Sequence, residues 1–213
     1  LYNVAFILVN MVIGIAIAIL ITEVKNIKLK KLYQSAILLP FLMSMVILSY
    51  IVYALLSAEN GLVNNSILPL FHMDPIQWYQ KPKYWPAILI IANCWKGVGY
   101  GCLIYIASLI GIDPSFYEAA RLDGASKWQE ITKITLPSLV PTIITLLLLS
   151  IGRIFYSDFG LFYQVPMNSG VLVSTTNVID TYVYRALIEQ GNISMSSAAG
   201  VYPVSYTHLR AHE

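Results

Sequence analysis

Charge is scarce in this chain. Of its 213 residues, 11% are charged and 57% are hydrophobic, whereas soluble domains carry about 25% charged residues. So few charges cannot cover the surface of a globule of this length, but lipid removes the need for them. The composition therefore favours a membrane protein with several spans over a soluble domain. The formal net charge of +2 says little about partners. We expect lipid around the chain and no nucleic-acid partner.

Reactive side chains are also rare. Cys94 and Cys102 fall inside one apolar segment, which favours helix packing over a disulfide or a metal pair. His72 stands alone, and Asp158 and Asp180 have no nucleophile or base arranged beside them. We therefore predict no catalytic residue, no metal and no cofactor. The pattern G-x-x-x-x-G-K-[ST] is absent too, so the chain cannot bind and hydrolyse ATP by itself in the usual way.

Long apolar segments are what the chain has in abundance. Each is about long enough to cross a hydrocarbon core of ~30 Å, and a backbone in lipid must satisfy its own hydrogen bonds, which predicts helices. Four such segments in one short chain argue against buried helices of a soluble protein. The predicted fold is therefore an all-α, polytopic membrane bundle, with spans over residues 1–21, 32–56, 85–111 and 138–156 and the start of another near 195–203.

The positive charges predict the orientation of these spans. The segments after the first and third spans hold seven lysines and arginines: Lys25, Lys28, Lys30, Lys31, Arg121, Lys127 and Lys133. The segments after the second and fourth spans hold three, Lys81, Lys83 and Arg185. Because positive charge favours the cytoplasmic side, we expect the chain to begin outside, with residues 57–84 and those from Ser157 onward facing the exterior.

The last ten residues differ from the rest. Residues 193–203 resemble the approach to a helix rich in small residues, and residues 204–213 are polar. We expect the segment from about Val204 to be foreign or truncated sequence, and residues 1–203 to form one membrane domain.

Residues 112–137, here called the polar loop, separate the third and fourth spans. Asp113-Pro114 is a good helix start, and Gly124 offers the left-handed geometry that ends helices. Ser126 and Gln129 have capping-box spacing for a second short helix, which precedes Pro137 and carries Trp128, Ile131 and Ile134. The sequence therefore predicts a helix–turn–helix at the membrane surface.

The same loop carries a resemblance. Glu118-Ala119-Ala120, three residues, Gly124, nine residues and Ile134-x-Leu136-Pro137 match the EAA loop of permease subunits of binding-protein-dependent ABC importers. The resemblance implies the type I importer permease fold, here incomplete at both ends, in the bacterial inner membrane. It also implies that the loop couples to cytoplasmic ATPase subunits through Glu118, Ala119, Ala120, Arg121, Asp123, Gly124, Ile134, Leu136 and Pro137.

The resemblance extends over most of the chain. NCWKGVGYGCLIYIASLIGIDPSFYEAA and DFGLFYQVPMNSG look like the branch that imports oligosaccharides and related sugar conjugates. The implied partners are ATPase subunits, a second permease subunit and an extracellular solute-binding protein, and the implied mechanism is alternating access driven by ATP. We expect Glu118 and Arg121 to pair with charges on a partner.

The third span holds the candidates for the translocation path: Trp95, Lys96, Gly97, Gly99, Tyr100 and Gly101. Lys96 lies about 11 residues into its span, or roughly 16 Å deep at 1.5 Å per residue, where a charge is costly and is expected to face a cavity or a partner. The glycines have two explanations: a widened or broken helix along the path, or close packing through Gly97-x-x-x-Gly101, which we favour.

Two other classes of function compete with the importer. A stand-alone secondary transporter or channel-like protein needs acidic residues in its membrane spans for ion coupling, and the four predicted spans contain none. A membrane-embedded enzyme needs clustered His, Asp or Glu, which the chain does not show.

Overall fold

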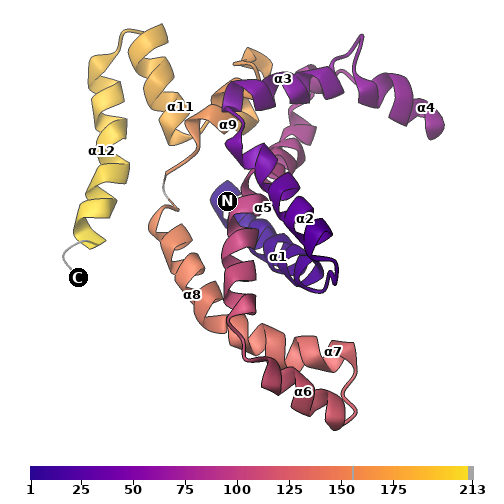
Figure 1. Cartoon of the computed structure of the whole chain (residues 1–213). Helices are drawn as coiled ribbons and strands as arrows, with labels where there is room; N and C mark the ends of the chain where they lie inside the picture. The colour runs from indigo at the N-terminus through magenta and orange to yellow at the C-terminus, as the bar shows by residue number, and fades with distance from the viewer. Residues whose placement is uncertain (155, 211–213) are drawn as a thin grey trace. The chain divides into compact units, whose positions relative to one another are not determined.

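The computed structural model describes residues 1–154 and 156–210, with side chains up to Val201. Its described residues divide into two compact units, each treated separately below. Figure 1 shows the chain as a series of helices. Two of the expected apolar segments become long helices close to their predicted bounds, α1 (Tyr2–Thr22) and α5 (Trp85–Ile110).

Unit 2 consists of Phe6–Leu42 and Cys94–Ile151. It contains most of α1, α2 (Ile27–Leu42), the second part of α5, α6 (Pro114–Leu122), α7 (Lys127–Glu130), the π-helical turn η4 (Ile131–Thr135) and most of α8 (Leu136–Gly152). Its core is made by side chains of α1, α5 and α8, which are Ala18, Ile21, Cys102, Tyr105, Ile106, Leu109 and Leu139. Cys94 and Cys102 are both free thiols, and Cys102 is fully buried in this core, as expected for packing residues.

Unit 1 consists of the described residues of Leu1–Ala5, Met43–Asn93 and Gly152–Glu213. Short elements follow one another along it: α3 (Met45–Leu56), η1 (Val63–Ile67), α4 (Leu68–Leu70), η2 (Trp78–Gln80), η3 (Pro82–Tyr84), α9 (Phe159–Gln164), η5 (Gly170–Leu172), α10 (Val173–Thr176), α11 (Ile179–Tyr184), η6 (Arg185–Glu189) and α12 (Ile193–Arg210).

A buried amide, Asn64, and a buried cation, Arg185, organise the loops of unit 1. Asn64 donates to the Ile76 carbonyl at 2.9 Å and accepts from the Trp78 indole at 2.9 Å. Arg185, also buried, donates to the side-chain oxygens of Asn168 and Asn177 at 3.0 and 2.9 Å. Because buried polar groups are costly without partners, these contacts hold the short elements in place.

The predicted span over residues 32–56 is wrong as a single helix. The apolar run is divided into α2, which begins earlier at Ile27, and α3, which begins at Met45. The break is explained by Ser44, whose hydroxyl accepts a hydrogen bond from the Ile47 N–H at 3.3 Å and so starts a new helix. Lys28, Lys30 and Lys31 consequently lie on α2 and not in a loop.

By length and composition, three helices in the described part of the chain can cross a membrane: Tyr2–Thr22, Pro82–Ile110 and Lys127–Gly152. The broken pair α2 and α3 makes a fourth if it crosses as one span. The backbone of α12 covers the further helix expected near residues 195–203. Residues 211–213 of the predicted foreign segment lie outside the described residues.

Candidate functional site

The polar loop begins as its sequence predicts. Asp113 has an extended backbone, and its carboxylate accepts a hydrogen bond from the Ser115 N–H at 2.9 Å, with Pro114 in the first helical position. The same hydrogen bond lowers the pKa of Asp113 from its ordinary value. A charged cap at a helix N-terminus is favourable because the helix dipole is positive there, so α6 starts at a defined residue.

The end of α6 is a complete glycine-terminated cap. The Ala125 N–H donates to the Ala120 carbonyl at 2.9 Å, and the Gly124 N–H donates to the Arg121 carbonyl at 3.1 Å. This is the Schellman pattern, whose key residue takes a left-handed backbone. Gly124 has φ of +79°, which confirms the prediction that it ends the helix.

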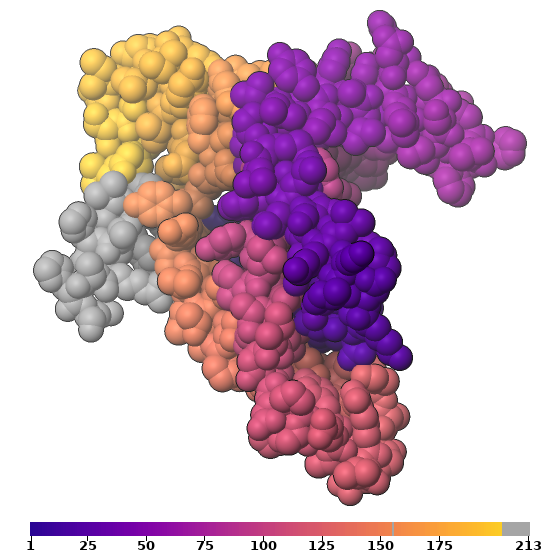
Figure 2. Space-filling view, viewed as in Figure 1, coloured from indigo at the N-terminus to yellow at the C-terminus, as the bar shows by residue number. Residues whose placement is uncertain are grey.

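The capping box that starts α7 is also confirmed. The Ser126 N–H donates to Gln129 Oε1 at 2.7 Å, and the Gln129 N–H donates to Ser126 Oγ at 3.4 Å. The two short helices are therefore joined by a turn of four residues, 123–126. In Figure 1 they lie beyond the ends of α5 and α8, and Figure 2 shows the same segment protruding from the rest of unit 2.

The second helix does not stop before Pro137. α7 passes through the π-helical turn Ile131–Thr135 into α8 without a break, so that Lys127–Gly152 forms one helical segment. Pro137 lacks a backbone N–H and crowds the preceding turn. The wider π turn, in which the Leu136 N–H bonds to the Ile131 carbonyl five residues back, accommodates this proline where sequence reasoning expected a boundary.

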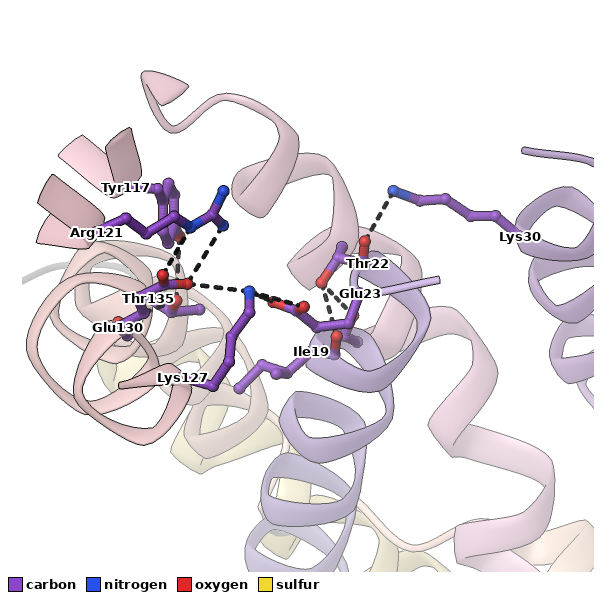
Figure 3. A network of polar contacts seen from close by, with 10 residues as sticks. Ile19, Thr22, Glu23, Lys30, Tyr117, Arg121, Lys127, Glu130 and Thr135 are labelled. Carbon is purple, nitrogen blue, oxygen red and sulfur yellow. Dashed lines mark hydrogen bonds and ion pairs between the residues drawn. The ribbon is translucent and has the colours of Figure 1, made fainter. Parts of the chain in front are cut away.

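A buried carboxylate joins the two short helices. Glu130 is 3% exposed, and its Oε1 accepts from Arg121 Nε at 2.8 Å while its Oε2 accepts from Lys127 Nζ at 3.0 Å. Lys127 also contacts the Glu23 carboxylate at 3.0 Å. Figure 3 shows these groups converging from α6, α7 and the end of α1. A neighbouring hydrogen bond, 3.0 Å between the Tyr117 and Thr135 hydroxyls, also joins α6 to η4.

The network determines the ionisation of Glu130. The Arg121 guanidinium, followed by the Lys127 ammonium, lowers the pKa of Glu130 from 4.5 to about 2. Within the helix Lys127–Gly152 the apolar part begins after Lys133, so Glu130 precedes the part that crosses the membrane. A depressed pKa means that the stabilising contribution is present above about pH 4.5 and is lost as the pH falls toward 2. At neutral pH the carboxylate is ionised.

The structure assigns Arg121 a different neighbour from the expected one. Sequence reasoning paired Arg121 with a partner protein, whereas its guanidinium bonds to Glu130 of the same chain. Glu118 and Ala119 are exposed on α6. Three large apolar side chains of the loop are exposed as well: Phe116, Leu122 at 89% and Trp128 at 72%. A protruding surface of this kind is typical of a protein-docking site.

Two hollows flank the loop. One, of about 330 Å³, is lined by Glu118 and Arg121 of α6 together with Glu23 of the turn after α1 and Lys30 of α2. The other, of about 340 Å³, lies between α6 and the α7–η4 segment and is lined by Ala120, Asp123, Gly124, Ala125, Gln129, Glu130, Lys133 and Ile134. The second hollow thus brings together several of the motif residues, while Leu136 and Pro137 begin α8.

The candidates for the translocation path lie on an unbroken helix, α5. Lys96 Nζ donates to the Phe41 carbonyl at 3.0 Å and lies 5.9 Å from the centre of the Phe41 ring. The Phe41 ring stacks on Tyr100, with 5.2 Å between ring centres. Since Phe41 is in the last turn of α2, where carbonyls lack helical partners, Lys96 caps that helix end. Trp95 and Tyr100 are exposed.

The glycines of α5 differ in what lies beside them. An ideal Cβ on Gly99 would lie 2.1 Å from the Ile37 carbonyl oxygen, so α2 packs directly on the α5 backbone there. A Cβ on Gly97 would lie 3.3 Å from Asn10 Oδ1, and one on Gly101 would meet nothing within 4 Å. Close packing therefore occurs at Gly99 against α2 and, less tightly, at Gly97 against Asn10 of α1, while Gly101 makes no such contact within this chain.

Sequence reasoning missed four residues: Glu23, Lys127 and Glu130 of the ion-pair network in the polar loop, and Phe41 beside Lys96. Lys127 and Glu130 are three residues apart, a spacing that places side chains on one helix face, and this signal was available. Glu23 is far from Lys127 in the sequence. Phe41 contacts Lys96 through its backbone carbonyl group, which every residue has. Neither of these two contacts has a sequence signal.

Comparisons with known proteins agree with this geometry. Residues 10–188 match the family model described as "Binding-protein-dependent transport system inner membrane component". The chain is 33% identical over 195 residues to the polygalacturonan/rhamnogalacturonan transport system permease protein YteP of Bacillus subtilis (strain 168), covering 89% of this chain and 58% of that protein. It is 31% identical over 188 residues to the lactose transport system permease protein LacF of Rhizobium radiobacter, covering 86% and 62%.

A solved structure gives the same result. A chain of a bacterial alginate ABC transporter, in complex with an alginate pentasaccharide-bound periplasmic protein, superposes with a TM-score of 0.89 at 32% identity, over 98% of this chain and 71% of that one. The all-α fold is thus that of an ABC importer permease. The chain spans less than two thirds of the length of the two permease relatives named above.

Proposed function

Because this chain belongs to the family of binding-protein-dependent transport system inner membrane components, we propose that it lines half of the path of an ATP-driven importer for a carbohydrate-type solute. The family is one of transport permeases of the inner membrane, and the chain is a transport component. ATP is hydrolysed by separate cytoplasmic subunits, and a second permease subunit completes the path. An extracellular solute-binding protein delivers the cargo.

The observation that carries this proposal is the polar loop. Its two short helices are fixed by an N-cap, a Schellman turn and a capping box, and they present exposed Glu118, Ala119 and Trp128. Small side chains beside a charge permit close approach of another protein. The sequence has no phosphate-binding loop. The energy of ATP therefore reaches the spans through an ATPase subunit that docks on this rigid surface.

We propose roles for the coupling residues that follow the sequence prediction, with one refinement. Glu118, Ala119 and Ala120 face the ATPase, while Asp123 and Gly124 form the turn between the helices. Ile134, Leu136 and Pro137 carry the movement into α8. Arg121 acts inside the loop, since its guanidinium is bound by Glu130.

The carbohydrate cargo is supported by the relatives and by one cluster on the spans. Two relatives are named for polygalacturonan and lactose transport, and the solved neighbour is named for alginate. On this chain, the stacked Phe41 and Tyr100 rings and the Lys96 ammonium lie together within unit 2. Aromatic rings offer flat faces to sugars. We place the path along Trp95, Lys96, Gly97, Tyr100 and Gly101, and leave out Gly99, which α2 covers.

The proposal is tested by reconstituting the complete transporter in proteoliposomes, with its ATPase subunit, second permease subunit and solute-binding protein. Ala119→Trp enlarges an exposed docking residue, and Ala58→Trp, an exposed alanine predicted to face outside, is the matched control. We expect Ala119→Trp to weaken ATPase binding about tenfold, which corresponds to ~1.4 kcal/mol, and Ala58→Trp to leave it unchanged.

Uptake is measured with neutral and uronic-acid oligosaccharides. Uptake of these sugars without any ATPase subunit contradicts the proposal.

A further inference from the structure

Glu130 occupies an unusual place for an acidic residue. It is 3% exposed in a loop whose other charged side chains are largely open to solvent, since Arg121 and Lys127 are each 56% exposed. Both of its oxygens accept hydrogen bonds from cations, one from each of the two helices that the turn joins. Through these contacts Glu130 connects α6 to α7.

The connection continues to a third element. Lys127 Nζ lies 3.0 Å from Glu130 Oε2 and 3.0 Å from Glu23 Oε2, and Glu23 follows directly after α1. The order of contacts is therefore Arg121 on α6, Glu130 and Lys127 on α7, and Glu23 at α1 (Figure 3). All four residues belong to unit 2.

The contacts in this series differ in strength. The Arg121–Glu130 contact has a second hydrogen bond, 3.4 Å from Nη2 to Oε2, and one partner that is almost fully buried. Removing a cation from a buried carboxylate leaves an uncompensated charge, which is strongly unfavourable. The Lys127–Glu23 pair is exposed on both sides, 56% and 48%, and is weak and screened by salt. The loop is thus rigid within itself and more loosely tied to α1.

Rigidity of this kind matters for a surface that transmits movement. Glu118 and Ala119 lie on α6, whereas Trp128 lies on α7. A partner that contacts both helices recognises the angle between them. The Schellman turn and the capping box define where the helices end and begin, while the Glu130 contacts and the Tyr117–Thr135 hydrogen bond bind the two helical segments to each other.

We propose that Glu130 is a positioning residue for energy coupling: it holds α6 and α7 as one body and, through Lys127, ties that body to α1 at Glu23. This inference rests on the function proposed above. Movement imposed on the polar loop by ATPase subunits then reaches α1 as well as α8. The depressed pKa of Glu130 supports a carboxylate that stays charged throughout the transport cycle.

The test compares variants in the reconstituted transporter. Glu130→Gln keeps the size but removes the charge, Glu130→Asp keeps the charge, and Glu59→Gln changes an exposed acid of the outer segment as a control. The readouts are sugar molecules transported per ATP hydrolysed, affinity for the ATPase subunit and melting temperature. We expect Glu130→Gln to lower the transport-to-ATP ratio about threefold or more, Glu130→Asp to recover part of it, and Glu59→Gln to match the parent.

A further variant separates positioning from folding. Glu23→Gln removes the last contact of the series at an exposed site and leaves the Arg121–Glu130 pair intact. We expect it to lower the transport-to-ATP ratio without changing ATPase affinity or melting temperature. A parent-like ratio in both Glu23→Gln and Glu130→Gln overturns the inference, while absence of ATP-dependent uptake in the parent complex instead overturns the proposed function. If Glu130→Gln does not fold, Glu23→Gln alone decides, and a parent-like ratio then overturns the connection to α1.

Discussion

At the scale of single residues, the polar loop depends on a few positions that tolerate few residue types. Gly124 is one of them, because its φ of +79° lies in the left-handed region, which costs an L-residue roughly 1–2 kcal/mol. An ideal Cβ at Gly124 would meet nothing within 4 Å. A larger side chain would therefore fit at this position. The backbone conformation is what restricts the residue type.

This distinction gives a prediction for Gly124. Gly124→Ala is expected to relieve its strain by opening the turn in the free protein, so that docking must restore the turn. The restoring cost of up to ~1–2 kcal/mol corresponds to an ATPase affinity lower by about five- to thirtyfold. Gly124→Asn is the matched comparison, since asparagine adopts left-handed geometry more readily.

The measurement is the dissociation constant between the purified permease complex and its ATPase subunit. Asparagine is expected to retain most of the affinity that alanine loses. If alanine and asparagine weaken binding equally, a steric effect of the new side chain and not backbone strain controls this position.

At the scale of elements, helix packing in unit 2 depends on a close approach of α2 to α5. The Ile37 carbonyl oxygen lies 2.1 Å from the position of a Cβ on Gly99, closer than any ordinary non-bonded contact of a Cβ atom. A carbonyl of the α2 backbone cannot rotate away as a side chain can. The position therefore tolerates only glycine without movement of a helix.

Gly99→Ala is expected to destabilise the protein by about 1–3 kcal/mol, the usual range for overpacking. Gly101→Ala is the control on the same helix, where the added methyl group meets nothing within 4 Å. Because alanine favours a helix over glycine by about 1 kcal/mol, Gly101→Ala is expected to be neutral or slightly stabilising. Thermal unfolding of the two variants in detergent checks this, and equal melting temperatures contradict the close packing.

Short-range signals explain which elements the sequence could predict. Asp113-Pro114, Gly124 and the Ser126–Gln129 pair act within a few residues of themselves, and each produced the expected cap or turn. The break between α2 and α3 had a signal of the same type, Ser44, but the apolar run around it favoured a single span. A polar residue that can cap outweighed continuous hydrophobicity there.

Contacts between distant elements were beyond such signals. Glu23 and Lys127 are 104 positions apart, and Lys96 finds a backbone carbonyl 55 positions away. Residue type indicates that Lys96 needs a partner, but not which atom supplies it. The very close approach at Gly99, the tight contact at Gly97 and the open space at Gly101 likewise depend on where α2 and α1 lie, which the spacing of glycines within α5 does not encode.

At the scale of the whole molecule, the proposed coupling to ATP requires that the polar loop face the cytoplasm. The count of seven positive residues against three favours that orientation, since positively charged segments are retained inside. The prediction concerns two exposed positions that we expect on opposite sides of the membrane. Lys25 lies in the segment between α1 and α2, and Glu59 lies in the segment after α3.

Lys25→Cys and Glu59→Cys are each treated with a membrane-impermeant maleimide in intact spheroplasts and after permeabilisation. The parent chain is the control, because Cys94 and Cys102 lie within the membrane helix α5 and Cys102 is buried. Glu59→Cys is expected to react in intact spheroplasts, and Lys25→Cys only after permeabilisation. The reverse pattern places the polar loop outside, away from ATP, and removes the basis for its role as an ATPase-docking surface, even though the fold remains that of a permease.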